Sequence, residues 1–188
     1  MKRRWTILSM LLLTFLVLSA QGLPSCEQTY TIRYNDVTIG KVTAYDNPDG
    51  LTCQQNYSYS SASAHPKEGP TLQDSVAQFW LFQGSNGLCL FSVFGLEVNS
   101  SNGTAKVNYQ LSGNGANGNV MLSDDNGELT ESSTNVFKGR WAWGDNTDGG
   151  VIGPLSGSDW VMEIDVIEMT GSLNAIAFTS GNGIPIPI

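Results

Sequence analysis

Apolar and polar residues alternate in short runs along most of this chain, and turn residues separate the runs. A period of two is typical of half-buried strands in an antiparallel β-protein. The runs predict strands at residues 30–34, 42–44, 57–59, 88–98, 105–112, 120–123, 128–132, 136–143, 160–168 and 175–179. The Gly- and Asn-rich stretches at 84–87, 99–103, 113–118 and 124–127 predict hairpin loops.

One segment has helical spacing instead. Its apolar residues are Leu72, Val76, Phe79 and Trp80. Asp74 stands three residues after Thr71, as in a capping box, so we expect one short helix there. Many short strands, Gly-rich turns and at most one helix predict an all-β fold. We expect an antiparallel β-sandwich or jelly-roll-like single domain.

The first 22 residues have the pattern of a secretory signal peptide. Lys2 to Arg4 are basic, residues 5–18 form an apolar run, and Ala20 and Gly22 are small residues that a signal peptidase accepts. The apolar run is too short for a stable transmembrane span. We therefore expect a leader over 1–22, one domain over 23–188 and no transmembrane segment. The protein is expected to be secreted, in the periplasm, or at the cell surface.

The expected mature chain is strongly acidic. The leader holds three of the nine Lys and Arg residues and none of the 17 Asp and Glu residues, which leaves a formal charge of −11. Such a chain repels phosphate-rich surfaces, so nucleic acid and anionic membranes are not expected partners.

Three cysteines, Cys26, Cys53 and Cys89, predict one disulfide and one remaining thiol in an oxidising compartment. Cys53 and Cys89 lie within patterned sequence, whereas Cys26 closely follows the leader, so Cys53 and Cys89 are the predicted pair. A bridge across that interval stabilises the fold by about 4 kcal/mol in the loop-entropy model. Whether Cys26 is free, paired or lipidated stays open, because residues 23–26 faintly resemble a bacterial lipobox.

The segment Glu163-Ile164-Asp165-Val166-Ile167-Glu168 resembles the E-I-D-x-x-E segment of laminarinase-type and lichenase-type β-glucanases, a jelly-roll family. The resemblance implies a retaining glycoside hydrolase, with Glu163 as nucleophile, Glu168 as acid/base and Asp165 tuning its neighbour. On a strand, Glu163 and Asp165 point to one face, and a bulge is needed to bring Glu168 beside them. The alternative is an ordinary strand with solvent-facing acidic residues.

Other catalytic and metal chemistry has less support. His65 is the only histidine and lies in a loop, and no G-x-S-x-G elbow is present, so neither a Ser-His-Asp site nor a zinc site is expected. Calcium is the better prospect, because the loops at 124–128 and 145–150 gather oxygen ligands around glycine turns. Asp145, Asn146 and Asp148 are the predicted ligands, although turns favour Asp and Asn in any case. No other cofactor is expected.

Three tryptophans surround the second of these loops. Trp141 and Trp143 share a strand face, and Trp160 follows the loop. Indole rings at a sandwich rim stack on sugar rings, so Trp141, Trp143 and Trp160 are the predicted ligand-binding residues. Packing in the core is the alternative use of paired tryptophans.

These patterns favour a secreted, non-catalytic binding module that recognises extracellular glycan or a cell surface, stabilised by calcium if the loops bind it. The first alternative is an extracellular structural protein that assembles through sheet edges and its apolar tail, Gly183 to Ile188. That tail is equally suited to close the protein's own sheet as an edge strand. The second alternative is a β-glucan hydrolase that uses Glu163 and Glu168.

Overall fold

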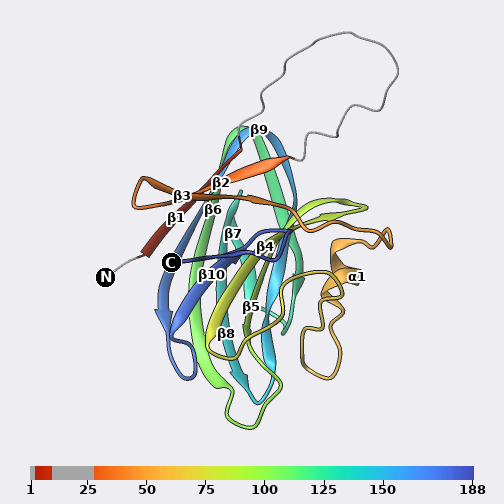
Figure 1. The fold of residues 1–188 in the computed structure, drawn as a ribbon, viewed down its shortest axis with the longest axis vertical. Helices are drawn as coiled ribbons and strands as arrows, with labels where there is room; N and C mark the ends of the chain where they lie inside the picture. Colours follow the sequence, from red (N-terminus) through yellow and green to blue (C-terminus); the bar gives the residue numbers. More distant parts are fainter. Residues whose placement is uncertain (1–2, 10–27) are drawn as a thin grey trace.

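The computed structural model describes the backbone of residues 3–9 and the whole of residues 28–188. Most of the predicted leader at 1–22, and also Cys26, lie outside the described residues. The described chain is nearly all β, as predicted, with a single short helix (Figure 1). Its elements are β1 (Arg3–Ser9), β2 (Thr29–Tyr34), β3 (Val37–Thr43), α1 (Cys53–Tyr57), β4 (Val76–Gly84), β5 (Gly87–Gly95), β6 (Asn102–Ser123), β7 (Leu129–Ser133), β8 (Val136–Gly144), β9 (Thr147–Met169), β10 (Ala175–Thr179) and β11 (Pro185–Pro187).

The long strand β9 organises the sheet. Its first part pairs with β5, its later part with β1, and β6 runs antiparallel along most of its length. The sheet order is β11-β10-β4-β5-β9-β1-β2-β3, and β6 carries the further pair β8 and β7. All pairs between named strands are antiparallel except β4 with β10, which is parallel. The arrangement is consistent with the predicted single β-sandwich domain.

The predicted hairpin loop at 113–118 is wrong, because these residues belong to β6. Asn114 pairs with Ser158 and Asn117 with Ser156 on β9, with register shifts between the pairs. Gly113 and Gly115 have φ of +124° and +65°, values that residues other than glycine rarely adopt. The glycines therefore allow bulges inside one long strand, where the sequence pattern indicated a turn.

The helix predicted over 71–80 is also wrong. Residues 76–84 form β4, whose apolar side chains alternate between two cores, with Phe79 and Leu81 on one side and Trp80 on the other. A strand buried on both faces has a nearly continuous apolar run, and this run mimicked helical spacing.

The helix occurs earlier in the chain, where a strand was predicted at 57–59. Thr52 and Gln55 form the capping box of α1: the Thr52 hydroxyl accepts from the Gln55 N–H at 3.2 Å, and the Gln55 side chain accepts from the Thr52 N–H at 2.8 Å. The helix ends at Ser58, whose φ is +52°. Tyr57 is therefore the last residue of a helix.

Two hydrophobic cores lie on opposite faces of β4 and β5. The first core also holds the inward residues of β6, β8 and β9, and the second is covered by α1 and its flanking loops (Figure 1). The predicted disulfide is present, and it joins Cys53 of α1 to Cys89 of β5. The bridge ties the loop-rich cover of the second core to a central strand.

The apolar tail closes the protein's own sheet. Pro185 to Pro187 pair with β10 as the antiparallel edge strand β11. Ile186 packs against Gly40 of β3, at the other end of the strand order. Proline is tolerated in this position because an edge strand leaves alternate N–H groups unpaired. Across the described part of the chain, no helix has the length and hydropathy needed to cross a membrane.

Candidate functional site

The three predicted sugar-stacking tryptophans are part of the first core. Trp141, Trp143 and Trp160 are 1%, 4% and 3% exposed. Trp141 lies against Phe94 with ring centroids 4.6 Å apart, and Trp160 lies against Tyr30 at 5.6 Å. The rings thus have no free face for a pyranose, so this structure corrects their assignment from ligand contact to core packing. The physical reason is that β8 and β9 turn these positions toward the facing sheet.

The three predicted calcium ligands do not converge on one point. The Asn146 side chain donates to the Ala62 carbonyl at 2.6 Å and accepts from the Gly144 N–H at 2.8 Å. The carboxylate of Asp148 is buried and accepts from the N–H groups of Ala142 and Gly149. Asp145 is exposed at the turn. Within residues 28–188, no group of three or more His, Cys, Asp or Glu side chains is placed to hold a metal ion.

The structure instead joins acidic residues from both predicted calcium loops. Asp124 is buried and its Oδ2 accepts from the Tyr57 hydroxyl at 2.7 Å. Burial raises the pKa of Asp124 to about 7, against the lowering effect of that hydrogen bond. Burial also raises the pKa of Asp148, and its hydrogen bond with Glu128 acts in the same direction. These side chains therefore retain protons well above the pH at which an ordinary Asp ionises.

The three carboxylates of the glucanase-like segment lie on one face of β9. Glu163 and Asp165 pair with Gln110 and Asn108 of β6, and Glu168 pairs with Lys106. The register shifts between Val166 and Glu168, which is the bulge that the sequence comparison required. Glu168 forms an ion pair with the Lys106 ammonium at 2.7 Å. The three side chains share the outer face, opposite the buried residues at 162, 164 and 166.

A cavity lies at the edge of the sheet that contains β4 and β10. We call it the β4–β10 cavity; its volume is about 660 Å³, and its walls are residues 69–73, β4, β10 and the segment 181–187. None of its lining residues is charged. Gln78 holds the 71–73 wall in place, because its side chain accepts from the Gln73 N–H at 2.8 Å and donates to the Thr71 carbonyl at 2.9 Å. The cavity is therefore preformed.

Two buried polar atoms without hydrogen-bond partners belong to Tyr45, which lines this cavity, and to Trp80, which lies next to the lining residue Gly69. Tyr45 is 9% exposed, and its buried Oη has no partner. Burial raises the pKa of Tyr45, so the hydroxyl keeps its proton. The buried Trp80 Nε1 also lacks a partner and lies 3.1 Å from the position that a Cβ on Gly69, another lining residue, would occupy. An unpaired buried donor costs about 1–3 kcal/mol, and a bound acceptor would remove that cost.

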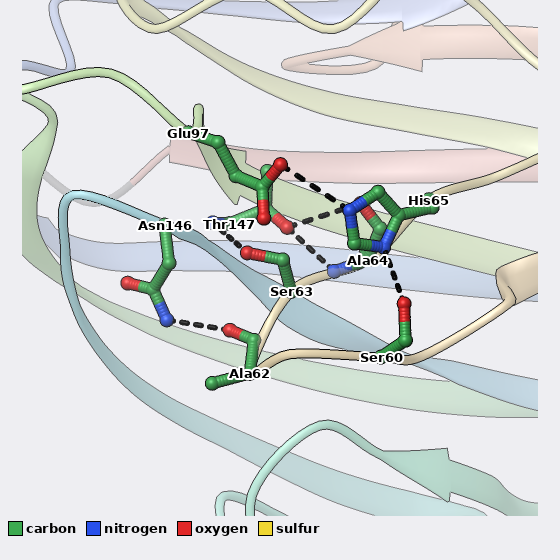
Figure 2. Close-up of polar contacts among 8 residues, drawn as sticks. All are labelled: Ser60, Ala62, Ser63, Ala64, His65, Glu97, Asn146 and Thr147. Carbon is green, nitrogen blue, oxygen red and sulfur yellow. Dashed lines mark hydrogen bonds and ion pairs between the residues drawn. The ribbon is translucent and has the colours of Figure 1, made fainter.

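A second polar cluster surrounds the only histidine, in the loop after α1 (Figure 2). Ser61 and Ala62 both have positive φ, of +51° and +60°, and form a two-residue turn closed by reciprocal backbone bonds between Ser60 and Ser63. Non-glycine residues in this conformation carry strain, which persists only where the surroundings hold it. Here Asn146 bonds to the Ala62 carbonyl.

His65 connects two further side chains in this cluster. Its Nδ1 lies 3.2 Å from the Ser60 hydroxyl and its Nε2 lies 3.2 Å from the Glu97 carboxylate (Figure 2). Hydrogen bonds from Ser63 and His65 hold the pKa of Glu97 below its ordinary value. A cavity of about 350 Å³ adjoins the pair and is lined by His65, Glu97, Leu72 and Leu96 among others. It shares Pro70 and Thr71 with the β4–β10 cavity.

Sequence reasoning did not single out Tyr45, Ser60 or Glu97. Tyr45 carries no motif, and its isolation is visible only once β4 packs beside it. Ser60 and Glu97 are separated by 37 positions and meet only because the 58–65 loop lies against the end of β5. The single signal that pointed here was that the chain has one histidine.

Comparison of this chain with protein-family models, with characterised proteins and with solved structures finds no match.

Proposed function

We propose that the protein is an extracellular binding module whose ligand is an uncharged glycan held in the β4–β10 cavity. The observation that carries this proposal is a cavity of about 660 Å³ lined by Tyr45, whose buried hydroxyl has no hydrogen-bond partner. That volume lies within the range of ligand sites, which commonly combine apolar walls with a few placed polar groups. The Cys53–Cys89 disulfide supports an oxidising, extracellular location.

The chemistry of the walls favours a neutral polyol over other small ligands. Gln, Thr and Tyr side chains offer hydrogen bonds to hydroxyl groups, and Pro, Val and Ile offer apolar surface to the faces of a sugar ring. An anionic ligand would find no cation in the cavity and would meet a chain whose formal charge is −8.

The test is thermal unfolding and calorimetric titration with neutral oligosaccharides from β-glucan, xylan and mannan. We expect one of these to raise the unfolding midpoint, because a ligand that binds only the folded state stabilises it. Tyr45→Phe should weaken binding about 10-fold, the effect of about 1.4 kcal/mol for one lost hydrogen bond. Its unfolding midpoint without ligand should not fall, since the removed hydroxyl has no partner.

The matched control is Tyr59→Phe, which removes the hydroxyl of an exposed tyrosine outside the cavity. This variant should bind as the wild type does, and polygalacturonate should bind neither protein. The proposal fails if none of the neutral sugars shifts the midpoint, or if Tyr45→Phe binds a sugar with unchanged affinity.

A second candidate function is β-glucan hydrolysis at β9. The observation that favours it is the bulge between Val166 and Glu168, which places Glu168 on the face of Glu163 and Asp165. In this role Glu163 would act as nucleophile and Glu168 as acid/base. We expect release of reducing sugar from laminarin or lichenan that Glu163→Gln abolishes. Absence of release by the wild type, or activity that survives the substitution, would exclude this function.

A further inference from the structure

We propose that Ser60, His65 and Glu97 form a nucleophilic site that hydrolyses esters of short acyl chains. This activity goes beyond the binding function proposed above and uses a different cavity. It is carried by three observations: the hydrogen-bond chain through the single histidine, the strained turn that holds the serine, and the apolar cavity beside them.

The hydrogen-bond chain assigns the protons. The carboxylate of Glu97 can only accept, so His65 donates its Nε2–H to it across 3.2 Å. In the neutral ring, Nδ1 is then the acceptor and takes the hydrogen bond from the Ser60 hydroxyl, also across 3.2 Å. A serine bonded to an imidazole that a carboxylate orients is the arrangement of an activated nucleophile. In the common triad, Nε2 faces the serine and Nδ1 faces the carboxylate. Here Nδ1 faces Ser60 and Nε2 faces Glu97, but the serine, histidine and carboxylate keep the same chemical roles.

The serine is presented by a turn that the rest of the fold holds. Ser60 precedes Ser61 and Ala62, the two positive-φ residues, and it is exposed. Thr147, the first residue of β9, holds the chain just after this turn, because its hydroxyl accepts a hydrogen bond from the Ala64 N–H at 2.6 Å. The Ser61 N–H takes no part in the two backbone bonds that close the turn. This N–H follows the nucleophile in sequence, the position from which hydrolases stabilise an oxyanion.

The adjoining cavity limits the acyl group. Its volume is about 350 Å³, and its lining includes the apolar Leu72 and Leu96 together with His65 and Glu97. An acyl chain of two to four carbons fits such a space.

The reaction balances with water as the only co-reactant. The Ser60 Oγ forms a bond to the ester carbonyl carbon while its proton passes to His65 Nδ1. The tetrahedral intermediate collapses, the carbon–oxygen bond to the alcohol breaks, and the alcohol leaves with the proton from His65. Water gives a proton to the same nitrogen and attacks the acyl carbon; the bond to Ser60 Oγ then breaks, Oγ takes the proton back from His65, and the carboxylic acid leaves. Glu97 acts as a positioning residue through the imidazole.

The test uses the purified, disulfide-bonded protein with p-nitrophenyl acetate, butyrate and decanoate, and with a fluorophosphonate probe. We expect hydrolysis of the two short esters, and a probe adduct that mass spectrometry maps to Ser60. Ser60→Ala and His65→Ala should lower the rate at least about 100-fold, the scale of general-base catalysis. Glu97→Gln should lower kcat about 10-fold or more and leave KM unchanged, which a purely structural role would not do.

The matched control is Ser100→Ala, which removes an exposed serine hydroxyl from the loop after β5, outside the proposed site, and should keep full activity. Unfolding midpoints of all variants show whether each is folded. A histidine alone attacks activated esters slowly, so hydrolysis that survives Ser60→Ala overturns the proposal. It is also overturned by a wild-type rate equal to that of buffer, or by a probe adduct at another residue. Sugar binding by Tyr45→Phe is measured separately, so failure of one proposal leaves the other testable.

Discussion

The protein is expected to unfold at a higher temperature at pH 5 than at pH 8. The folded-state pKa of Asp124 is about 7, raised by burial from the ordinary 3.8, and burial raises that of Asp148 as well. Between about pH 4 and pH 7 the folded state therefore binds more protons than the unfolded state. The contribution of these two groups to stability is fully present below their unfolded pKa and is lost as the pH rises through their folded pKa. The midpoint should fall by at least about 5 °C between pH 5 and pH 8.

Asp124→Asn isolates the buried group in this pH dependence. Asparagine keeps an oxygen that accepts from the Tyr57 hydroxyl, but it does not ionise, so the difference between the two pH values should shrink by about half or more. The control Asp49→Asn removes the same charge from an exposed turn and should leave the pH dependence as in the wild type. A wild-type midpoint that rises between pH 5 and pH 8 would contradict the assignment. Scanning calorimetry at constant ionic strength measures all three proteins.

Gly139→Ala is expected to destabilise the fold by about 3 kcal/mol or more, which lowers the midpoint by roughly 6–12 °C. Gly139 is buried two residues before Trp141 on β8, and a Cβ there would overlap the six-membered ring of that tryptophan. The ring has little room to move, because it is 1% exposed and packs against Phe94 and Tyr109. Relief of the overlap would therefore disrupt the centre of the first core.

The same strand offers a matched control, Gly144→Ala. A Cβ on Gly144 meets no atom within 4 Å, and the residue is exposed. This variant should unfold within about 1 kcal/mol of the wild type, because alanine costs less backbone entropy than glycine and creates no overlap. Denaturant unfolding of both variants checks the pair. Equal stability of Gly139→Ala and Gly144→Ala would mean that Trp141 is not packed over Gly139 as described.

The two cavities give the binding and esterase proposals a common geometry. They share the lining residues Pro70 and Thr71, which places them on the two sides of one segment. If both proposals hold, an acylated oligosaccharide is the natural substrate to examine next. If only the sugar binds, His65 and Glu97 form a polar rim for the neighbouring cavity.

The sequence by itself determined the β-class of the protein, most of its strands and the partner of Cys53. These features depend on local alternation, on turn residues and on the position of cysteines within patterned segments, all of which act over a few residues. It failed where two layers bury both faces of a strand, as in β4, because the two-residue period then disappears. It failed again in β6, where Gly113 and Gly115 make bulges inside one strand.

Only the tertiary structure decided the use of the chemically interesting residues. Trp141, Trp143 and Trp160 have the same pattern whether a strand face meets solvent or a second sheet, and here the facing layer buries them. Segments far away in sequence bury the Tyr45 hydroxyl without a hydrogen-bond partner. Burial also raises the pKa of Asp124. Loop packing brings together Ser60, His65 and Glu97. Hydrogen bonds between such distant positions depend on how the layers pack, and they produce no local sequence pattern.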